Sequence, residues 1–271
     1  MEKNNSTILS LMLAGLMTIS FSPEKILAQP HGETKTKQPV CRKLTPVVNS
    51  EFTNNYLSTS TGQIVDDNER IQTYAGTTLN GNGWGLFENL SLYTWGDFDI
   101  EQERFEEVDI GLTAPLKTNY LSLKLSGAAF FYPNSNLNTT GEIGLEISPK
   151  TEEKLPLKPS LYVGQALGNE ANGLPNGKLI QLALQKRKEL TGKTSLSLEG
   201  TLNYSDQYCT KERGFSNAYI EGKLQHNITK ALSLHLGIGH SLPLNDGFNL
   251  EDQTQVKAGI TYCLPTINKH N

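Results

Sequence analysis

The sequence has no long apolar run beyond its first thirty residues, few prolines and no excess of positive charge. After that first segment, no apolar stretch approaches the ~20 residues that a membrane-spanning helix needs. A mature chain that crosses a membrane must therefore cross it as strands. The formal net charge of -4 argues against nucleic acid as a partner, because such binding depends on Lys and Arg neutralising phosphates. With 271 residues, 37% of them hydrophobic, the chain is long enough for one large folded domain.

Residues 1–28 predict a secretory signal peptide. Lys3 supplies the positive n-region, residues 8–21 form the apolar h-region, and Ala28 offers a small residue at a cleavage site. Ile26 stands where a small residue is usual, so a retained N-terminal anchor is the alternative. No cysteine directly follows the apolar segment, which disfavours a lipid-anchored form.

Polar segments flank the part of the chain that is expected to fold. Residues 29–46 are rich in lysine and arginine and show no periodic apolar pattern, so we predict a flexible periplasmic leader. A functional basic arm is the alternative for this segment. Residues 265–271 form a polar C-terminal tail. The folded part is therefore expected within residues 47–264.

Within residues 47–264, apolar and polar residues alternate with a period of two, which indicates strands and not helices. The clearest run is 232–239, where leucine and isoleucine alternate with serine, histidine and glycine. Turn residues divide the region into twelve segments: 47–57, 69–79, 84–95, 105–114, 120–132, 139–148, 158–167, 177–189, 194–205, 217–228, 231–242 and 253–264.

The connections between these segments alternate in length. Tight connections are 80–83, 115–119, 190–193 and 229–230; long ones are 58–68, 96–104, 168–176, 206–216 and 243–252, and only 149–157 departs from the alternation. An even number of ~10-residue strands, with short turns at one end and longer loops at the other, is typical of outer-membrane barrels. We therefore predict an all-β fold, an up-and-down antiparallel transmembrane β-barrel of about 12 strands in the outer membrane of a Gram-negative bacterium.

The last segment resembles the C-terminal assembly signal of outer-membrane barrels. A polar residue, a glycine, an aromatic residue and a final apolar residue stand at Lys257, Gly259, Tyr262 and Leu264. The usual terminal Phe is absent, and the polar tail follows. The resemblance implies that the chain meets the barrel assembly machinery and outer-membrane lipid.

Two further stretches resemble the porins of the TorF type. They are Phe105-Glu106-Glu107-Val108-Asp109-Ile110-Gly111 and Ala129-Phe130-Phe131-Tyr132-Pro133-Asn134, with residues 52–57 in the place of that family's first strand. Where the family tends to carry an Arg-Gly pair after its first aromatic strand, this chain has Leu57-Ser58-Thr59. The resemblance implies an outer-membrane location and a barrel architecture.

No catalytic, metal-binding or phosphate-binding motif in the sequence has the geometry that its function needs. His240 and Ser241 are the most suggestive pair, but adjacent residues of a strand point to opposite faces, so the imidazole cannot readily activate the hydroxyl. The five histidines show no close metal-ligand spacing. Gly81-Asn82-Gly83 favours a hairpin turn and not a phosphate loop. We therefore predict no enzymatic activity, no metal site and no cofactor.

Charged residues on the polar faces of the strands predict a charged lumen. Pairing of consecutive strands would place Lys124 between Glu107 and Asp109 on one side and Glu142 and Glu146 on the other. Opposite charges at such positions lie ~5 Å apart and attract each other.

A second cluster would join Glu199 to Lys223. Both clusters leave an acid excess, so the predicted function is a porin-like channel for small solutes or ions that weakly favours cations. One alternative is a plugged barrel for surface interaction or envelope integrity, because twelve strands enclose less space than open porins do. Another alternative, of a different class, is a soluble periplasmic β-protein that binds an apolar ligand.

The three cysteines are an odd number in an expected oxidising compartment. The first and last strands of a barrel are neighbours; Cys41 precedes the first, and Cys263 lies at the periplasmic end of the last. These two cysteines are therefore candidates for a disulfide. Cys209 would lie at the opposite rim and stay free.

Overall fold

The computed structural model describes residues 44–57, 64–66, 68–80, 85–150, 157–208, 210–248 and 250–263. The predicted signal peptide, most of the leader, Cys41, Cys209, Leu264 and the C-terminal tail lie outside the described residues. What the sequence predicts for them stays a prediction.

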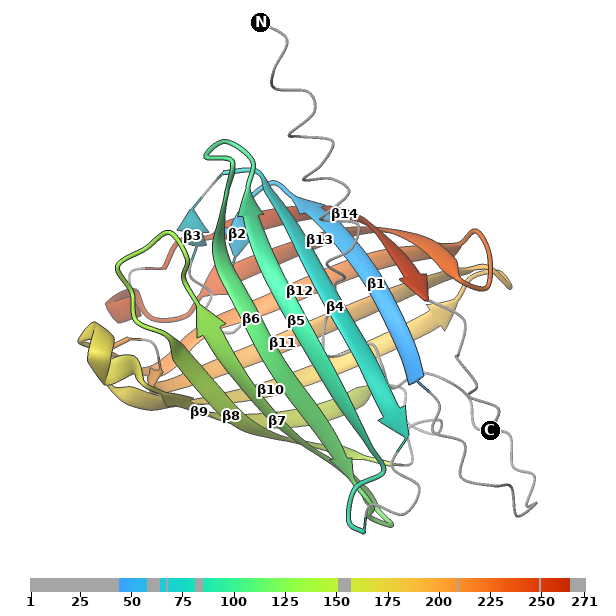
Figure 1. Ribbon diagram of the computed structural model, residues 1–271, viewed down its shortest axis with the longest axis horizontal. Helices are drawn as coiled ribbons and strands as arrows, with labels where there is room; N and C mark the ends of the chain where they lie inside the picture. Colours follow the sequence, from blue (N-terminus) through green and yellow to red (C-terminus); the bar gives the residue numbers. More distant parts are fainter. Residues whose placement is uncertain are drawn as a thin grey trace, which may run out of the picture.

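Twelve strands close into one antiparallel barrel (Figure 1). In chain order they are β1 (Leu44–Thr53), β4 (Arg70–Asn80), β5 (Asn89–Asp99), β6 (Arg104–Leu116), β7 (Leu121–Phe131), β8 (Thr140–Pro149), β9 (Lys158–Leu167), β10 (Asn176–Glu189), β11 (Thr194–Tyr208), β12 (Arg213–Asn227), β13 (Leu232–Pro243) and β14 (Gln253–Cys263). Each strand pairs with the next along this order, and β14 returns to β1. The predicted up-and-down barrel of twelve strands is confirmed.

Smaller elements lie in the connections. β2 (Tyr56–Leu57) and β3 (Ile64–Asp66) form a separate two-stranded sheet between β1 and β4. Residues Asn169–Asn172 and Asp246–Phe248 form short 3₁₀ helices. In the described part of the chain, no helix is long and apolar enough to span a membrane.

The seam of the barrel is made by β1 and β14. Val47 pairs with Cys263 at one end of this seam, and Thr53 pairs with Lys257 at the other. On its other edge, β1 pairs with β4 over its whole length. Lipid offers no hydrogen-bond partners, so a sheet that crosses a membrane must satisfy all its backbone groups internally. Closure achieves this because it leaves no free edge.

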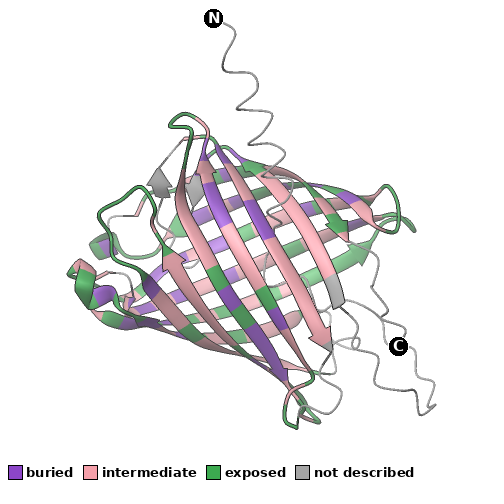
Figure 2. Ribbon diagram, viewed as in Figure 1, coloured by how far each residue is buried: buried purple, intermediate pink, exposed green. Residues whose placement is uncertain are grey.

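The distribution of apolar and polar side chains is the reverse of that in a soluble protein. Large apolar side chains are exposed on the outside, among them Leu236 at 61%, Ile220 at 58% and Ile110 at 57%. Charged and amide side chains are buried on the inside; the most buried include Arg70, Asp97, Asp99, Asn203, Asn217 and Gln255. Along many strands, more and less exposed positions alternate (Figure 2). An apolar belt of this extent is suited to lipid, which removes the soluble periplasmic alternative.

Two of the predicted long loops are largely strand. β5 runs on to Asp99 and β6 begins at Arg104, so only residues 100–103 connect them. Similarly, β11 extends to Tyr208 and β12 begins at Arg213. The two ends of the barrel therefore differ less in loop length than the sequence predicts.

The third barrel strand, expected at residues 84–95, lies at Asn89–Asp99. In the sequence, the acidic residues Asp97 and Asp99 are of a type more common in loops than in strands. In the fold, however, Arg70 on the neighbouring strand contacts both carboxylates and holds them in the sheet.

We predict that Leu236→Arg destabilises the barrel in a bilayer by roughly 2–4 kcal/mol, because an arginine near the bilayer midplane loses hydration. Leu236 is 61% exposed and lies in the middle of β13. Leu244→Arg is the control: this residue is 48% exposed but lies in the connection after β13, so we expect a change within about 0.5 kcal/mol. Urea unfolding in lipid vesicles measures both, and equal effects would contradict a lipid-facing outer wall.

Candidate functional site: the barrel interior

The barrel interior is the candidate site because the buried charged side chains of the described residues point into it. Strand residues alternate between two faces, so the register fixes which side chains line the inner wall. Apart from exposed ion pairs at the strand ends, the inner wall of the described strands carries nine carboxyl groups and five lysine or arginine side chains. The acids are Glu51, Asp97, Asp99, Glu107, Asp109, Glu142, Glu146, Glu199 and Glu221; the cations are Arg70, Lys124, Lys158, Lys223 and Lys257.

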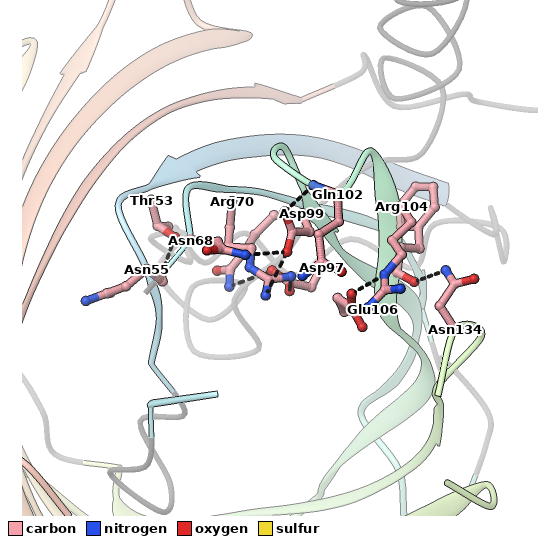
Figure 3. Close-up of polar contacts among 12 residues, drawn as sticks. Thr53, Asn55, Asn68, Arg70, Asp97, Asp99, Gln102, Arg104, Glu106 and Asn134 are labelled. Carbon is pink, nitrogen blue, oxygen red and sulfur yellow. Dashed lines mark hydrogen bonds and ion pairs between the residues drawn. The ribbon is translucent and has the colours of Figure 1, made fainter. Parts of the chain in front are cut away.

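At the loop end, Arg70 lies between two carboxylates (Figure 3). Its Nη1 lies 3.1 Å from Asp97 Oδ2 and its Nη2 3.3 Å from Asp99 Oδ2, with all three side chains fully buried. Asn68 Nδ2 donates a hydrogen bond to Asp99 at 2.9 Å, and the backbone N–H of Gln102 donates to the same carboxylate at 2.8 Å. The cluster therefore ties β4 to β5 and holds the short connection that follows β5.

Lys124 and Glu146 lie directly opposite each other on β7 and β8 and form an ion pair, with the lysine side chain buried. The prediction that Lys124 also faces Glu107 and Asp109 is wrong. Pro115 is the β6 residue opposite Lys124, and it stands six positions from Asp109, about 20 Å along the strand. The stagger between β6 and β7 separates charges that strand order alone would bring together.

A second network of charges lines β1 and β12–β14. Glu51 Oε2 lies 3.2 Å from the ammonium of Lys223 and 2.6 Å from Nε2 of His235. Glu221 Oε2 lies 2.6 Å from the ammonium of Lys257. Each of the two lysines on this side therefore has a carboxylate partner.

The register corrects the predicted pairing of Lys223 with Glu199. Glu199 lies opposite Glu221, Ser197 lies opposite Lys223, and Lys223 reaches past β13 and β14 to Glu51. The sequence-based prediction omits Glu51 and Glu221. The signal for both was present, because each stands beside an outward-facing apolar residue in an alternating run.

Glu142 lies between two tyrosine hydroxyls. Tyr162 from β9 donates to its Oε1, and Tyr208 from the loop end of β11 donates to its Oε2. Two strands separate β8 from β11, so the Tyr208 contact crosses part of the interior. Among the described residues, the carboxylate of Glu142 has hydroxyl donors and no cationic partner.

Acidic side chains gather around Asp109. We call Asp97, Glu107, Asp109 and Glu142 the acidic wall. Asp97 lies directly opposite Glu107, and Asp109 is within hydrogen-bonding reach of Glu107. Within the described residues, Oδ1 of Asp109 is buried without a hydrogen-bond partner. The acidic wall lies roughly opposite strands β12 and β14, which carry Lys223 and Lys257.

Several aromatic rings of the inner wall lie against a glycine of the neighbouring strand. The pairs are Tyr93 with Gly111, Tyr162 with Gly144, Tyr219 with Gly239, and His235 with Gly259. A Cβ on any of these glycines would overlap the ring. The missing side chain therefore provides the space in which each ring lies close to the wall.

Neutral amides connect β10 to β13. Gln181 donates to Asn203 at 2.9 Å, Asn203 to Asn217 at 3.0 Å, and Asn217 to Ser241 at 3.1 Å. These side chains satisfy one another's hydrogen bonds inside the barrel, which removes the cost of burying an unpaired polar group. This part of the inner wall is therefore polar without adding charge.

Residues assigned to the assembly signal have other contacts in the fold. Lys257 pairs with Glu221, and Gly259 accommodates the ring of His235, so both face the interior. Tyr262 faces outward and is 39% exposed. The signal itself stays a prediction. Cys263 stands opposite Val47, but its predicted partner Cys41 lies outside the described residues.

No protein-family model matches the chain, and no curated protein matches it. Among solved structures, an outer-membrane channel from Pseudomonas putida F1 is similar with a TM-score of 0.50 and 10% identity, over 86% of this chain and 100% of that chain. At this identity the likeness concerns the fold. The location rests on the closed barrel and its apolar outer belt. The chain is an outer-membrane β-barrel.

Two further solved structures share the architecture of this outer-membrane barrel. The NanC porin has a TM-score of 0.49 and 10% identity over 81% of this chain and 100% of that chain. Outer membrane phospholipase A from Escherichia coli has a TM-score of 0.47 and 12% identity over 82% of this chain and 96% of that chain. The prediction of no enzymatic activity is therefore corrected, because barrels similar to this one include an enzyme.

The structure separates His240 from Ser241 as the strand geometry predicts. His240 faces outward, with Nδ1 2.9 Å from Thr254 Oγ1 and Nε2 2.8 Å from Asp252 Oδ1, whereas Ser241 is buried inside. Within the described ranges, no group of three or more His, Cys, Asp or Glu side chains is arranged to hold a metal ion.

We predict that Arg70→Met destabilises the barrel by roughly 3–5 kcal/mol, because it leaves two buried carboxylates without their cation. Arg104→Met is the matched control. Arg104 pairs with Glu106 at 2.5 Å, but its side chain is 42% exposed, so the expected loss is below about 1 kcal/mol. Urea unfolding compares the two variants, and similar losses would show that the Arg70 cluster does not depend on burial.

Gly144→Ala is expected to cost roughly 1–3 kcal/mol, because the new Cβ must displace the ring of Tyr162. Gly127→Ala on the adjacent strand is the comparison, since the nearest atom to its Cβ is 3.8 Å away. We expect that variant to stay within about 1 kcal/mol of the wild type. If both alanines are tolerated equally in urea unfolding, the ring is not held against the wall.

Proposed function

We propose that the chain is a porin-like channel that passes small solutes or ions and weakly favours cations. The observation that carries the proposal is the acid excess of the inner wall, nine carboxyl groups against five cations in the described strands. A wall that bears one sign of charge raises the local concentration of the opposite ion. The fold that it shares with an outer-membrane channel supports the same proposal.

The arrangement of the charges supports cation preference more than their number does. Lys223 and Lys257 are each matched by a carboxylate, so their side of the barrel has little net charge. The acidic wall lies on the other side, where Arg70 is paired with Asp97. A solute inside the barrel would therefore meet a negative surface on one side and a nearly neutral one on the other.

The resemblance to porins of the TorF type also belongs to this proposal. The residues that carry it, 105–111 and 129–134, lie on or directly after the neighbouring strands β6 and β7. They include Glu107 and Asp109 of the acidic wall. We propose outer-membrane lipid, small solutes or ions and the barrel assembly machinery as partners, and no nucleic acid.

A plugged barrel for surface interaction or envelope integrity is the second candidate. The contacts of Tyr208 with Glu142 and of Lys223 with Glu51 favour it, because each passes two strands within the interior. Side chains that bridge the interior reduce the space that a solute can use.

Reversal potentials in a planar bilayer test the proposal. Glu142→Gln should lower the cation-to-anion permeability ratio by about twofold, because the change removes charge from the acidic wall. The control is Glu189→Gln, because this side chain is 63% exposed at the turn end. It removes the same formal charge outside the interior and should leave the ratio nearly unchanged.

An unchanged ratio in a conducting Glu142→Gln channel would contradict the role of the acidic wall. Absence of conductance in the folded wild type and in both variants would favour the plugged barrel.

A further inference from the structure

Among the described residues, the connections at the two ends of the barrel carry opposite charge. The loop-end connections 100–103, 132–139, 168–175, 210–212 and 244–252 hold seven acidic residues and one lysine within the described residues. The described turn residues at the other end hold four lysines, at positions 117, 150, 193 and 230, and one acid, Glu88. Short turns face the periplasm in bacterial outer-membrane barrels, so the basic end faces that side.

The basic residues of this end are most concentrated in the β10–β11 hairpin. β10 pairs with β9 only as far as Gln185 opposite Lys158, but it pairs with β11 up to Glu189 opposite Ser195. Residues 186–193 therefore extend past the edge of β9. This extension contains Lys186, Arg187, Lys188 and Lys193 and one acid, Glu189. It lies next to the β12–β13 turn (Figure 1), where the N–H of Asn227 donates to the carbonyl of Lys193 at 2.8 Å.

Two lysines of this hairpin continue the lipid-facing side of β10. Ile180, Leu182 and Leu184 are exposed on that side at 39%, 47% and 44%. Lys186 and Lys188 follow at the same spacing of two residues, and Lys186 lies opposite the outward-facing Leu198. Both lysines are exposed, and in the described part of the chain neither has a carboxylate partner.

This order of residues places two ammonium groups where the apolar belt ends. Lys186 lies about 7 Å beyond Leu184 along the strand, and Lys188 about 7 Å further. A lysine at that depth keeps its methylene groups along the apolar surface and extends its ammonium to the headgroup level. Neighbouring Arg187 is different, because its side chain is on the other face and pairs with Glu189 at 3.1 Å.

We propose that Lys186 and Lys188, with Lys193 beside them, bind the headgroups of anionic phospholipids in the periplasmic leaflet. The outward direction of both side chains selects lipid over a periplasmic protein, because a protein partner would have to displace the lipid beside β10. The phosphodiester is the group that the ammonium ions recognise, and a negative headgroup strengthens the attraction. The proposal requires the barrel in a membrane and does not depend on whether it conducts.

Native mass spectrometry of the folded full chain in detergent tests the proposal, with equal amounts of phosphatidylglycerol and phosphatidylcholine as competing probes. The wild type should retain phosphatidylglycerol in preference to phosphatidylcholine by about fivefold or more, because each lysine near an anionic surface strengthens binding by about fivefold. Lys186→Gln combined with Lys188→Gln, which leaves Lys193 in place, should lower this ratio by about fivefold or more.

Lys178→Gln is the matched control, because Lys178 is exposed on the same face of the same strand but at the loop end. It should keep the wild-type ratio, as should Lys186→Arg combined with Lys188→Arg, which retains both charges. Heat-dependent gel mobility checks that every variant is folded. A wild-type ratio of one, an unchanged ratio in the double glutamine variant or an equal loss in Lys178→Gln would overturn the proposal.

Discussion

Closure between β1 and β14 is the constraint on which the rest of the structure depends. A backbone in lipid has no water to pair with, so every N–H and C=O of the twelve strands needs a partner in the sheet. The seam satisfies this requirement in a register that runs from Val47 opposite Cys263 to Thr53 opposite Lys257. Once each strand is in register with its neighbours, the wall that each side chain faces follows from the period of two.

The same alternation determines how the interior is stabilised. Because the apolar residues face lipid, polar and charged residues must fill the interior and satisfy one another there. Arg70 does so with two carboxylates, Lys124 with Glu146, and Glu142 with two tyrosine hydroxyls. Glycines on the inner wall provide the remaining space, because rings such as Tyr93 need room close to the backbone. The interior is therefore a network of paired groups in which a limited acid excess remains.

The excess of acidic groups lies on one side of the interior, and this position matters for function. Lysines 223 and 257 are neutralised within their own network, whereas Asp109 and Glu142 have no cation partner among the described residues. The loop end is also acidic and the turn end basic, so the charge of the barrel is ordered across its interior and along its axis. An acidic entrance and wall would raise the local concentration of cations, and a basic outer rim would attract anionic headgroups. The first effect depends on charges inside the barrel and the second on charges on its outer surface, so the two proposed roles are compatible.

The sequence by itself determined the number of strands, most of their bounds and the face of most strand residues, because the period-two pattern is local and each strand carries it independently. It did not determine that residues 96–99 are strand, since the partner that holds Asp97 and Asp99 there, Arg70, lies on another strand. Only the tertiary structure decided which charges meet. Lys124 meets Glu146 but not Asp109, and Lys223 meets Glu51, because stagger between strands and contacts across the interior both depend on how the whole sheet closes.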